Sequence, residues 1–185
     1  TININGGTFT AKGIKASASA GGTNILNING GTLKLGETGI TSYGSTSISV
    51  NVGGNATFEA TAETLPVSQS VNLAQDVSLT IKGYVKFTGV VSGAGSFIAD
   101  GEGVVLDFGN ANMEAFTGSY SVQNGATLIL PAGAETGVSV PEGCTLKLSL
   151  SQEQLAKGYS SKANSPVSFV TREGDAVTDN VNGGV

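Results

Sequence analysis

The sequence predicts an all-β fold, a right-handed parallel β-helix in which successive coils of the chain stack on one another. The phrase N-I-N-G-G-T occurs at residues 3–8 and again at residues 27–32. Apolar and polar residues alternate on both sides of each glycine pair, which is the period of a strand with one buried face. Hydrophobic residues make up 39% of the chain and charged residues 12%, a balance typical of a folded protein rather than a disordered one.

The repeated unit contains about two dozen residues or fewer. Phe9, Leu33 and Phe58 each follow a glycine-rich turn and are separated by 33 − 9 = 24 and 58 − 33 = 25 residues. Leu128 and Leu146 follow similar turns 146 − 128 = 18 residues apart. Fixed-period self-similarity of this size indicates a solenoid.

Within each unit we expect a strand, a glycine turn and a second strand. The apolar side chains of these strands should point into the core. Going along the chain, the expected inward positions are Ile2, Ile4, Phe9 and Ala11; Leu26, Ile28, Leu33 and Leu35; Ile48, Val50, Val52, Phe58 and Ala60; and Val77, Leu79, Ile81, Val85 and Phe87.

Equivalent coils of a parallel β-helix stack about 4.8 Å apart, so like residues lie on like residues. This explains the recurring asparagines, whose side-chain amides can form a ladder, and the glycines, which tolerate the bends. An antiparallel β-sandwich is the alternative, because Asn-Gly also favours hairpins. The expected ladder and turn residues are Asn3, Asn5, Gly6, Gly7, Asn27, Asn29, Gly30, Gly31, Gly53 and Gly54.

Residues 1–150 are predicted to be the β-helix, and residues 151–185 a cap or a junction to a following module. Ser151, with Gln154 three residues later and Gly158 beyond, predicts a short helix with a capping box. After Pro166, two apolar stretches flank residues 173–175 and predict a hairpin.

The stretch from residue 93 to residue 130 resembles the autotransporter-associated β-strand repeat of bacterial passenger domains. Phe116-Thr117-Gly118 and the segment V-Q-N-G-A-T-L-I-L at residues 122–130 match the later parts of that pattern, with one extra residue in the second part. The opening is degraded to D-G-E-G at residues 100–103. The I-N-G-G-T phrases are similar to repeats in pectate-lyase-like surface proteins. The resemblance implies a passenger-type β-helix, secretion, and activities located elsewhere in the protein.

Composition argues against several classes of partner and of enzyme. The net charge of −5 and the pI near 4.6 disfavour nucleic acid and anionic membranes, and no apolar stretch is long enough to span a bilayer. The chain has no histidine, which removes the usual serine-hydrolase triad and a histidine-based zinc site. Cys144 aligns with Ala126 and is interpreted as a small core residue. Because residue 1 is Thr, we expect a segment of a longer protein.

The acidic residues Asp100, Glu102 and Asp107 are the best candidates for a site. The two-residue spacing of Asp100 and Glu102 would place both carboxylates on one face of a strand, which suits a calcium site or a glycosidase pair. Gly101 and Gly103 favour a solvated turn instead. A sugar-stacking platform would have to come from tyrosines such as Tyr43, Tyr84 and Tyr120, and packing is the default expectation for them.

The sequence therefore predicts a non-enzymatic, secreted β-helix segment of a bacterial surface protein. It would act as a stalk, scaffold or adhesin, located outside the cell or on its surface, with glycans or other copies of itself as partners. It needs no cofactor, calcium being the one candidate. The alternative function is a carbohydrate-binding module or part of a polysaccharide-cleaving β-helix enzyme.

Overall fold

The computed structural model describes residues 1–16 and 24–171, which form a parallel β-solenoid of about seven turns. The elements are β1 (Ile2–Lys15), β2 (Asn24–Thr41), β3 (Ile48–Val52), β4 (Ala56–Ala60), β5 (Leu65–Val67), β6 (Ser70–Leu73), β7 (Ser78–Lys82), β8 (Tyr84–Phe87), β9 (Val90–Gly93), β10 (Ser96–Asp100), β11 (Val105–Asp107), β12 (Asn112–Phe116), β13 (Ser119–Gln123), β14 (Thr127–Pro131), β15 (Thr145–Leu150), α1 (Gln152–Lys157) and β16 (Ser168–Thr171).

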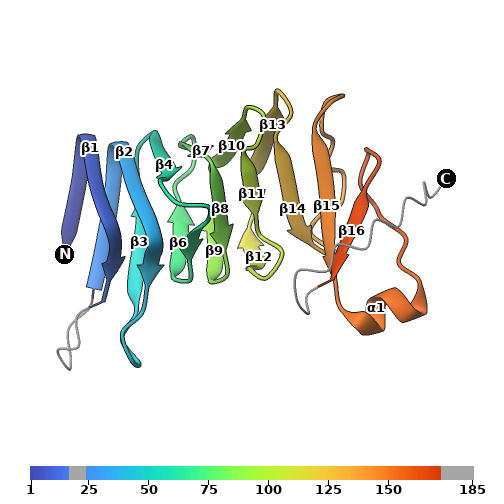
Figure 1. Ribbon diagram of the computed structural model, residues 1–185, viewed down its shortest axis with the longest axis horizontal. Helices are drawn as coiled ribbons and strands as arrows, with labels where there is room; N and C mark the ends of the chain where they lie inside the picture. The colour runs from blue at the N-terminus through green and yellow to red at the C-terminus, as the bar shows by residue number, and fades with distance from the viewer. Residues whose placement is uncertain (17–23, 172–185) are drawn as a thin grey trace.

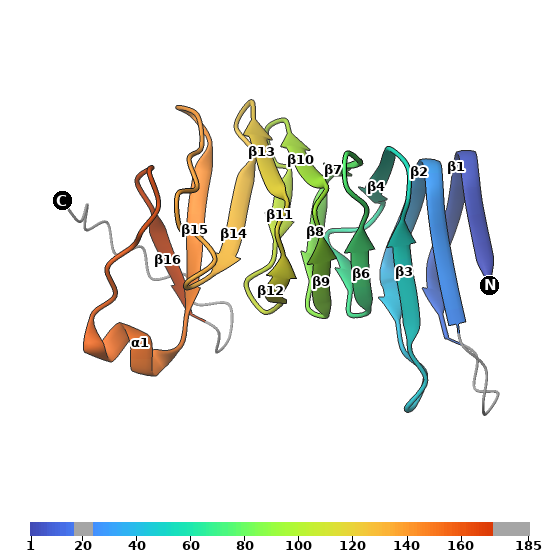
Figure 2. The ribbon, with the colours of Figure 1, turned by 180° about the vertical axis from the view of Figure 1, so that it is seen from behind.

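The strands form three rows along the solenoid, here called faces A, B and C (Figures 1 and 2). Face A contains the first parts of β1 and β2, then β3, β6, β9 and β12. Face B contains their middle parts, then β4, β7, β10 and β13. Face C contains their last parts, then β5, β8, β11, β14, β15 and β16. With three faces, each coil is roughly triangular in cross-section.

Every pairing between these strands in the described part of the chain is parallel, which confirms the β-helix and excludes the antiparallel sandwich. The register follows the sequence repeat. Phe9 pairs with Leu33, and Leu33 with Phe58. Stacked equivalent positions therefore bury equivalent side chains, as the alternation of the sequence requires.

The core is one continuous column of apolar side chains between the three faces. Its centre is aromatic: the ring centroid of Phe87 lies 5.0 Å from that of Phe108 and 5.5 Å from that of Phe97. Most of the expected inward positions are buried. Ile2 and Phe9 are exceptions, with exposed fractions of 41% and 38%, because among the described residues β1 pairs only with β2 and has no coil on its other side.

The glycine turns are as expected, for two different reasons. Gly31 has φ of +84°, and a Cβ built there would lie 2.4 Å from the carbonyl oxygen of Gly7 in the coil before. At Gly54 the backbone is not in the left-handed region, yet a Cβ would lie 2.2 Å from the carbonyl oxygen of Asn29. Coils about 4.8 Å apart thus leave no room for a side chain at either position.

Faces A and B end earlier than face C. Between β13 and residue 171, only face C gains strands, and β16 continues the stack after residue 150. The helix α1 lies between β15 and β16 and has the predicted capping box, with Ser151 and Gln154 bonded reciprocally and Gly158 as the C-cap. The first arm of the predicted hairpin is β16, which pairs in parallel with β15. The rest of that hairpin lies outside the described residues.

Candidate functional site

The most regular polar feature is a ladder of asparagine amides on the outside of face A. Asn51 Nδ2 donates to Asn27 Oδ1 at 3.0 Å, and Asn27 Nδ2 donates to Asn3 Oδ1 at 2.8 Å. A second, shorter ladder joins Asn29 Nδ2 to Asn5 Oδ1 at 2.9 Å. All of these amides donate toward the N-terminal end. The predicted pairing of Asn3 with Asn27 and of Asn5 with Asn29 is confirmed.

The first ladder continues one coil further than the repeated phrase indicated. Asn51 lies 51 − 27 = 24 residues after Asn27, so the period alone could have located it. In the next coils Asn72 occupies the same position and donates through Nδ2 to Ser92 Oγ at 3.0 Å. From β1 to β9, face A therefore presents one amide or hydroxyl per coil, and the row ends in β12, where Ala115 pairs with Ser92.

The three acidic candidates are not brought together. Asp100 is exposed at the end of β10 on face B and accepts a 2.6 Å hydrogen bond from Asn124 Nδ2, while Glu102 is exposed in the following turn. Asp107 is 5% exposed on face C, where Tyr84 Oη and the Gly109 N–H each donate to it at 2.8 Å. Within residues 1–16 and 24–171 no three acidic, Cys or His side chains are grouped to hold a metal ion. Calcium binding stays a prediction that this geometry does not favour.

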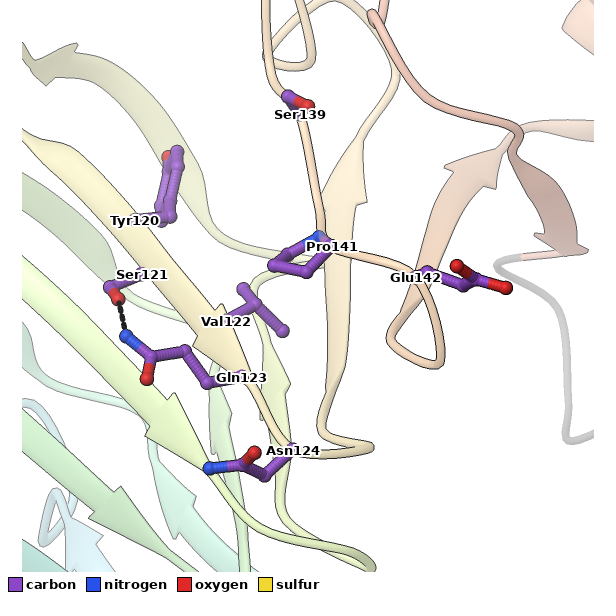
Figure 3. Close-up of a pocket in the computed structure, with 8 residues that line it drawn as sticks. All are labelled: Tyr120, Ser121, Val122, Gln123, Asn124, Ser139, Pro141 and Glu142. Carbon is purple, nitrogen blue, oxygen red and sulfur yellow. Dashed lines mark hydrogen bonds between the residues drawn. The ribbon is translucent and has the colours of Figure 1, made fainter.

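An open groove of about 480 Å³ lies beside β13 (Figure 3). It forms because β13 pairs only with β10 and the next coil crosses as an irregular segment. Gln123 Nε2 donates to Ser121 Oγ at 2.8 Å, and Glu142 points away from the β13 side chains. The lining residues are Tyr120, Ser121, Val122, Gln123, Asn124, Ser139, Pro141 and Glu142.

The chemistry of this groove is hydrogen bonding rather than acid–base catalysis. Burial raises the pKa of Tyr120 well above its ordinary range, so its hydroxyl stays protonated at neutral pH. On the same side of the groove, Ser121 supplies a hydroxyl, and Gln123 and Asn124 supply side-chain amides; these groups are hydrogen-bond donors and acceptors without a titration near pH 7. Sequence reasoning missed the groove because it depends on where faces A and B stop.

The buried carboxylate of Glu135 connects the last coils through hydrogen bonds. Its side chain is 0% exposed and accepts hydrogen bonds from Tyr159 Oη at 2.6 Å, the Gly133 N–H at 2.6 Å and the Lys162 N–H at 3.3 Å. Burial acts to raise the pKa of Glu135, but these three donors outweigh it and hold the pKa below its ordinary value. Burial and the nearby carboxylate raise the pKa of Tyr159 to about 12. No repeated motif in the sequence marks Glu135.

The remaining candidates occupy separate places. Cys144 stands in register with Ala126, as the alignment predicts, but it is half-buried and packs against the core, whereas Ala126 is fully buried in it. Tyr43 is 51% exposed, Tyr84 is bonded to Asp107, and Tyr120 packs on Phe108. The three tyrosines lie in different parts of the solenoid and form no common platform.

No protein-family model, curated protein or solved structure matches this chain. The resemblance to autotransporter and pectate-lyase-like repeats therefore stays a prediction. No helix in the described part of the chain is long and apolar enough to cross a membrane.

Proposed function

We propose that the chain is a non-enzymatic scaffold segment of a secreted bacterial surface protein. The observation that supports this most is the single apolar column that runs through every coil, with rows of polar side chains on the outside. Such a column fixes the coils relative to one another. Side chains on the faces are thereby held at a constant spacing.

The dimensions favour a scaffold over a long spacer. Seven ladder steps separate β1 from β16 on face C, which corresponds to about 34 Å at ~4.8 Å per step. A flexible Gly/Ser chain of the same length has a root-mean-square span of roughly 75 Å. The fold therefore provides stiffness and surface rather than reach.

The polar rows suit an adhesive role. Face A presents Asn3, Asn27, Asn51 and Asn72 in successive coils, and face B presents a row of threonines with Thr32, Thr57 and Thr80 in register. Amides and hydroxyls at ~4.8 Å intervals can bond to a glycan along its length without a deep pocket.

Single-molecule fluorescence energy transfer tests the scaffold role. Fluorescent proteins are fused to the two ends of the chain, and the control replaces the chain with 185 Gly/Ser residues. A scaffold gives one narrow transfer efficiency that persists until the protein unfolds, whereas the control gives a broad one. A broad distribution for the folded chain would contradict the proposal.

The groove beside β13 favours glycan binding as a second candidate function. Calorimetry with cell-wall and plant polysaccharides, together with a reducing-end assay, tests it. Binding that is lost in the double variant Gln123→Ala with Asn124→Ala would support a carbohydrate-binding module. Released sugar ends that disappear in Asp100→Ala with Glu102→Ala would replace the scaffold proposal with the enzyme alternative.

A further inference from the structure

We infer that the groove beside β13 binds an extended segment of another protein, which adds as one strand between β13 and residues 138–140. This inference goes beyond the scaffold role and does not depend on it. In strand addition, the backbone hydrogen bonds supply affinity, and alternate side chains supply specificity. Both walls of the groove come from described residues (Figure 3).

The first observation is the direction of the backbone groups of β13, which hydrogen bonds at its two ends define. The Ser119 N–H donates to the carbonyl oxygen of Gly95 at 3.0 Å, and the Gly101 N–H donates to that of Gln123 at 3.1 Å. A parallel strand bonds to one neighbour through every second residue. Residues 119, 121 and 123 therefore face β10.

The two residues between them, Tyr120 and Val122, direct their N–H and C=O groups to the opposite edge. Among the described residues β13 pairs with β10 alone, and no backbone hydrogen bond joins this opposite edge to another segment. Val122 is only 4% exposed. Because unpaired backbone groups at a buried position cost free energy, this edge is suited to a partner strand.

The second observation is the opposite wall of the groove, where the chain bonds away from β13. The Val138 carbonyl oxygen accepts from the Asn164 N–H at 2.8 Å, and the Val140 N–H donates to Ser165 Oγ at 2.9 Å. Because backbone groups of an extended chain alternate in direction, Ser139 directs its N–H and C=O to the groove, which it lines. Neither group has a backbone partner in the described part of the chain.

The size of the groove fits one short strand. With ~4.8 Å between strands, ~3.3 Å per residue and ~10 Å between stacked sheets, one strand residue occupies roughly 160 Å³. The groove of about 480 Å³ thus corresponds to about three residues. That is the length of the free edge from Tyr120 to Val122.

The walls also indicate the chemistry of the bound segment. In register with β13, two of its residues would stack on Tyr120 and Val122 and point inward, and the residue between them would stack on Ser121 and point outward. We therefore expect two small apolar residues on either side of a serine or threonine. Glu142 is the one charged residue among those lining the groove, and it points away from the β13 side chains. An uncharged segment fits this lining.

Two other occupants fit less well. A slot with two walls takes a segment whose two edges are both free, whereas each described strand of this chain is already paired on at least one edge. A glycan could bond to the side chains of Ser121, Gln123 and Asn124, but it lacks the alternating N–H and C=O groups that match the two walls. An extended peptide of another protein matches both.

Nuclear magnetic resonance titration of the full 185-residue chain tests the inference, with the blocked peptide acetyl-T-V-S-V-T-amide as the probe. The peptide should shift the backbone amides of Val122 and Ser139 saturably. It should also slow hydrogen exchange of the Val122 amide at least tenfold at saturation, whereas the Ser121 amide, which faces β10, should exchange slowly with and without it. The matched control peptide carries an N-methyl group on its serine, the residue that would bond to β13, and should bind roughly tenfold more weakly.

Three variants of the chain test the walls separately. Val122→Pro removes an N–H that faces the groove and retains the bonds to β10, because proline is tolerated where the N–H of an edge strand is unpaired. Ser139→Pro removes the N–H of the opposite wall. Each should weaken peptide binding roughly tenfold. Glu142→Gln lines the same groove without facing β13 and should leave peptide binding unchanged.

Several results would overturn the inference. These are unshifted amides at Val122 and Ser139, equal binding of the N-methylated peptide, or a Val122 amide that exchanges as slowly as that of Ser121 in the free chain, because the chain would then fill its own groove. Shifts at Val122 with a neutral oligosaccharide but not with the peptide would assign the groove to glycan binding instead. None of these results changes the energy-transfer test of the scaffold, so the two proposals fail independently.

Discussion

The close stacking of coils can be measured with one pair of alanine substitutions, Gly93→Ala and Gly103→Ala. Both glycines have positive φ, +100° and +76°, so each alanine incurs a backbone penalty of about 1–2 kcal/mol. A Cβ at Gly93 would also lie 2.0 Å from the carbonyl oxygen of Leu73 in the coil before, whereas a Cβ at Gly103 has nothing within 4 Å. Relieving that overlap costs a further 1–3 kcal/mol, roughly.

We therefore expect Gly93→Ala to lower the free energy of unfolding by about 2–5 kcal/mol and Gly103→Ala by about 1–2 kcal/mol. Urea denaturation followed by circular dichroism measures both values, with the slope of the transition as a check that the unfolded state is unchanged. The difference between the variants isolates the contact between coils. Equal losses of stability would refute the stated reason for glycine at position 93.

Three further predictions concern the core, the ladder and the last coils. Phe97→Ala removes a ring that contacts Phe87 and Phe108, and should cost about 3–5 kcal/mol in urea denaturation; a loss below 1 kcal/mol would contradict the packing. Asn27→Ala removes two exposed hydrogen bonds between asparagine side chains and should lower the free energy of unfolding by about 1 kcal/mol; if the variant is as stable as the unmodified chain, the ladder has no energetic role. The folded-state pKa of Glu135 lies below its unfolded value, so its contribution to stability is present above the unfolded pKa and declines as the pH falls through the folded one. Thermal unfolding between pH 3 and pH 6 should show this decline, and Glu135→Gln should be less stable at pH 6 with a smaller decline; an identical pH profile would contradict it.

The strands, the turns and the ladder could be predicted because they depend on local spacing. Alternation around the glycine pair at residues 30–31 defines which side chains face inward, and the 24-residue offset from Asn3 to Asn27 defines what stacks on what. The capping box at Ser151 is equally local.

The features that could not be predicted from the sequence depend on where each face begins and ends, and on contacts between loops. Phe9 has the spacing of a core residue, yet it is half-exposed because β1 is the first strand of its row. Asp100 and Asp107 are seven residues apart in sequence, but the chain turns between them from face B to face C. The buried Glu135 carboxylate accepts hydrogen bonds from three donors in two loops. No periodic pattern in the sequence predicts this arrangement.

The parallel, in-register stacking of the coils is tested most directly by double electron–electron resonance. Spin labels are attached to cysteines substituted for Thr10 and Gln123, in a chain with Cys144→Ser. Both residues are exposed on face B, and five ladder steps separate β1 from β13. The solenoid predicts one narrow distance peak corresponding to a Cα separation of about 24 Å. A peak below about 15 Å, or a broad distribution in the folded protein, would contradict stacking in this register.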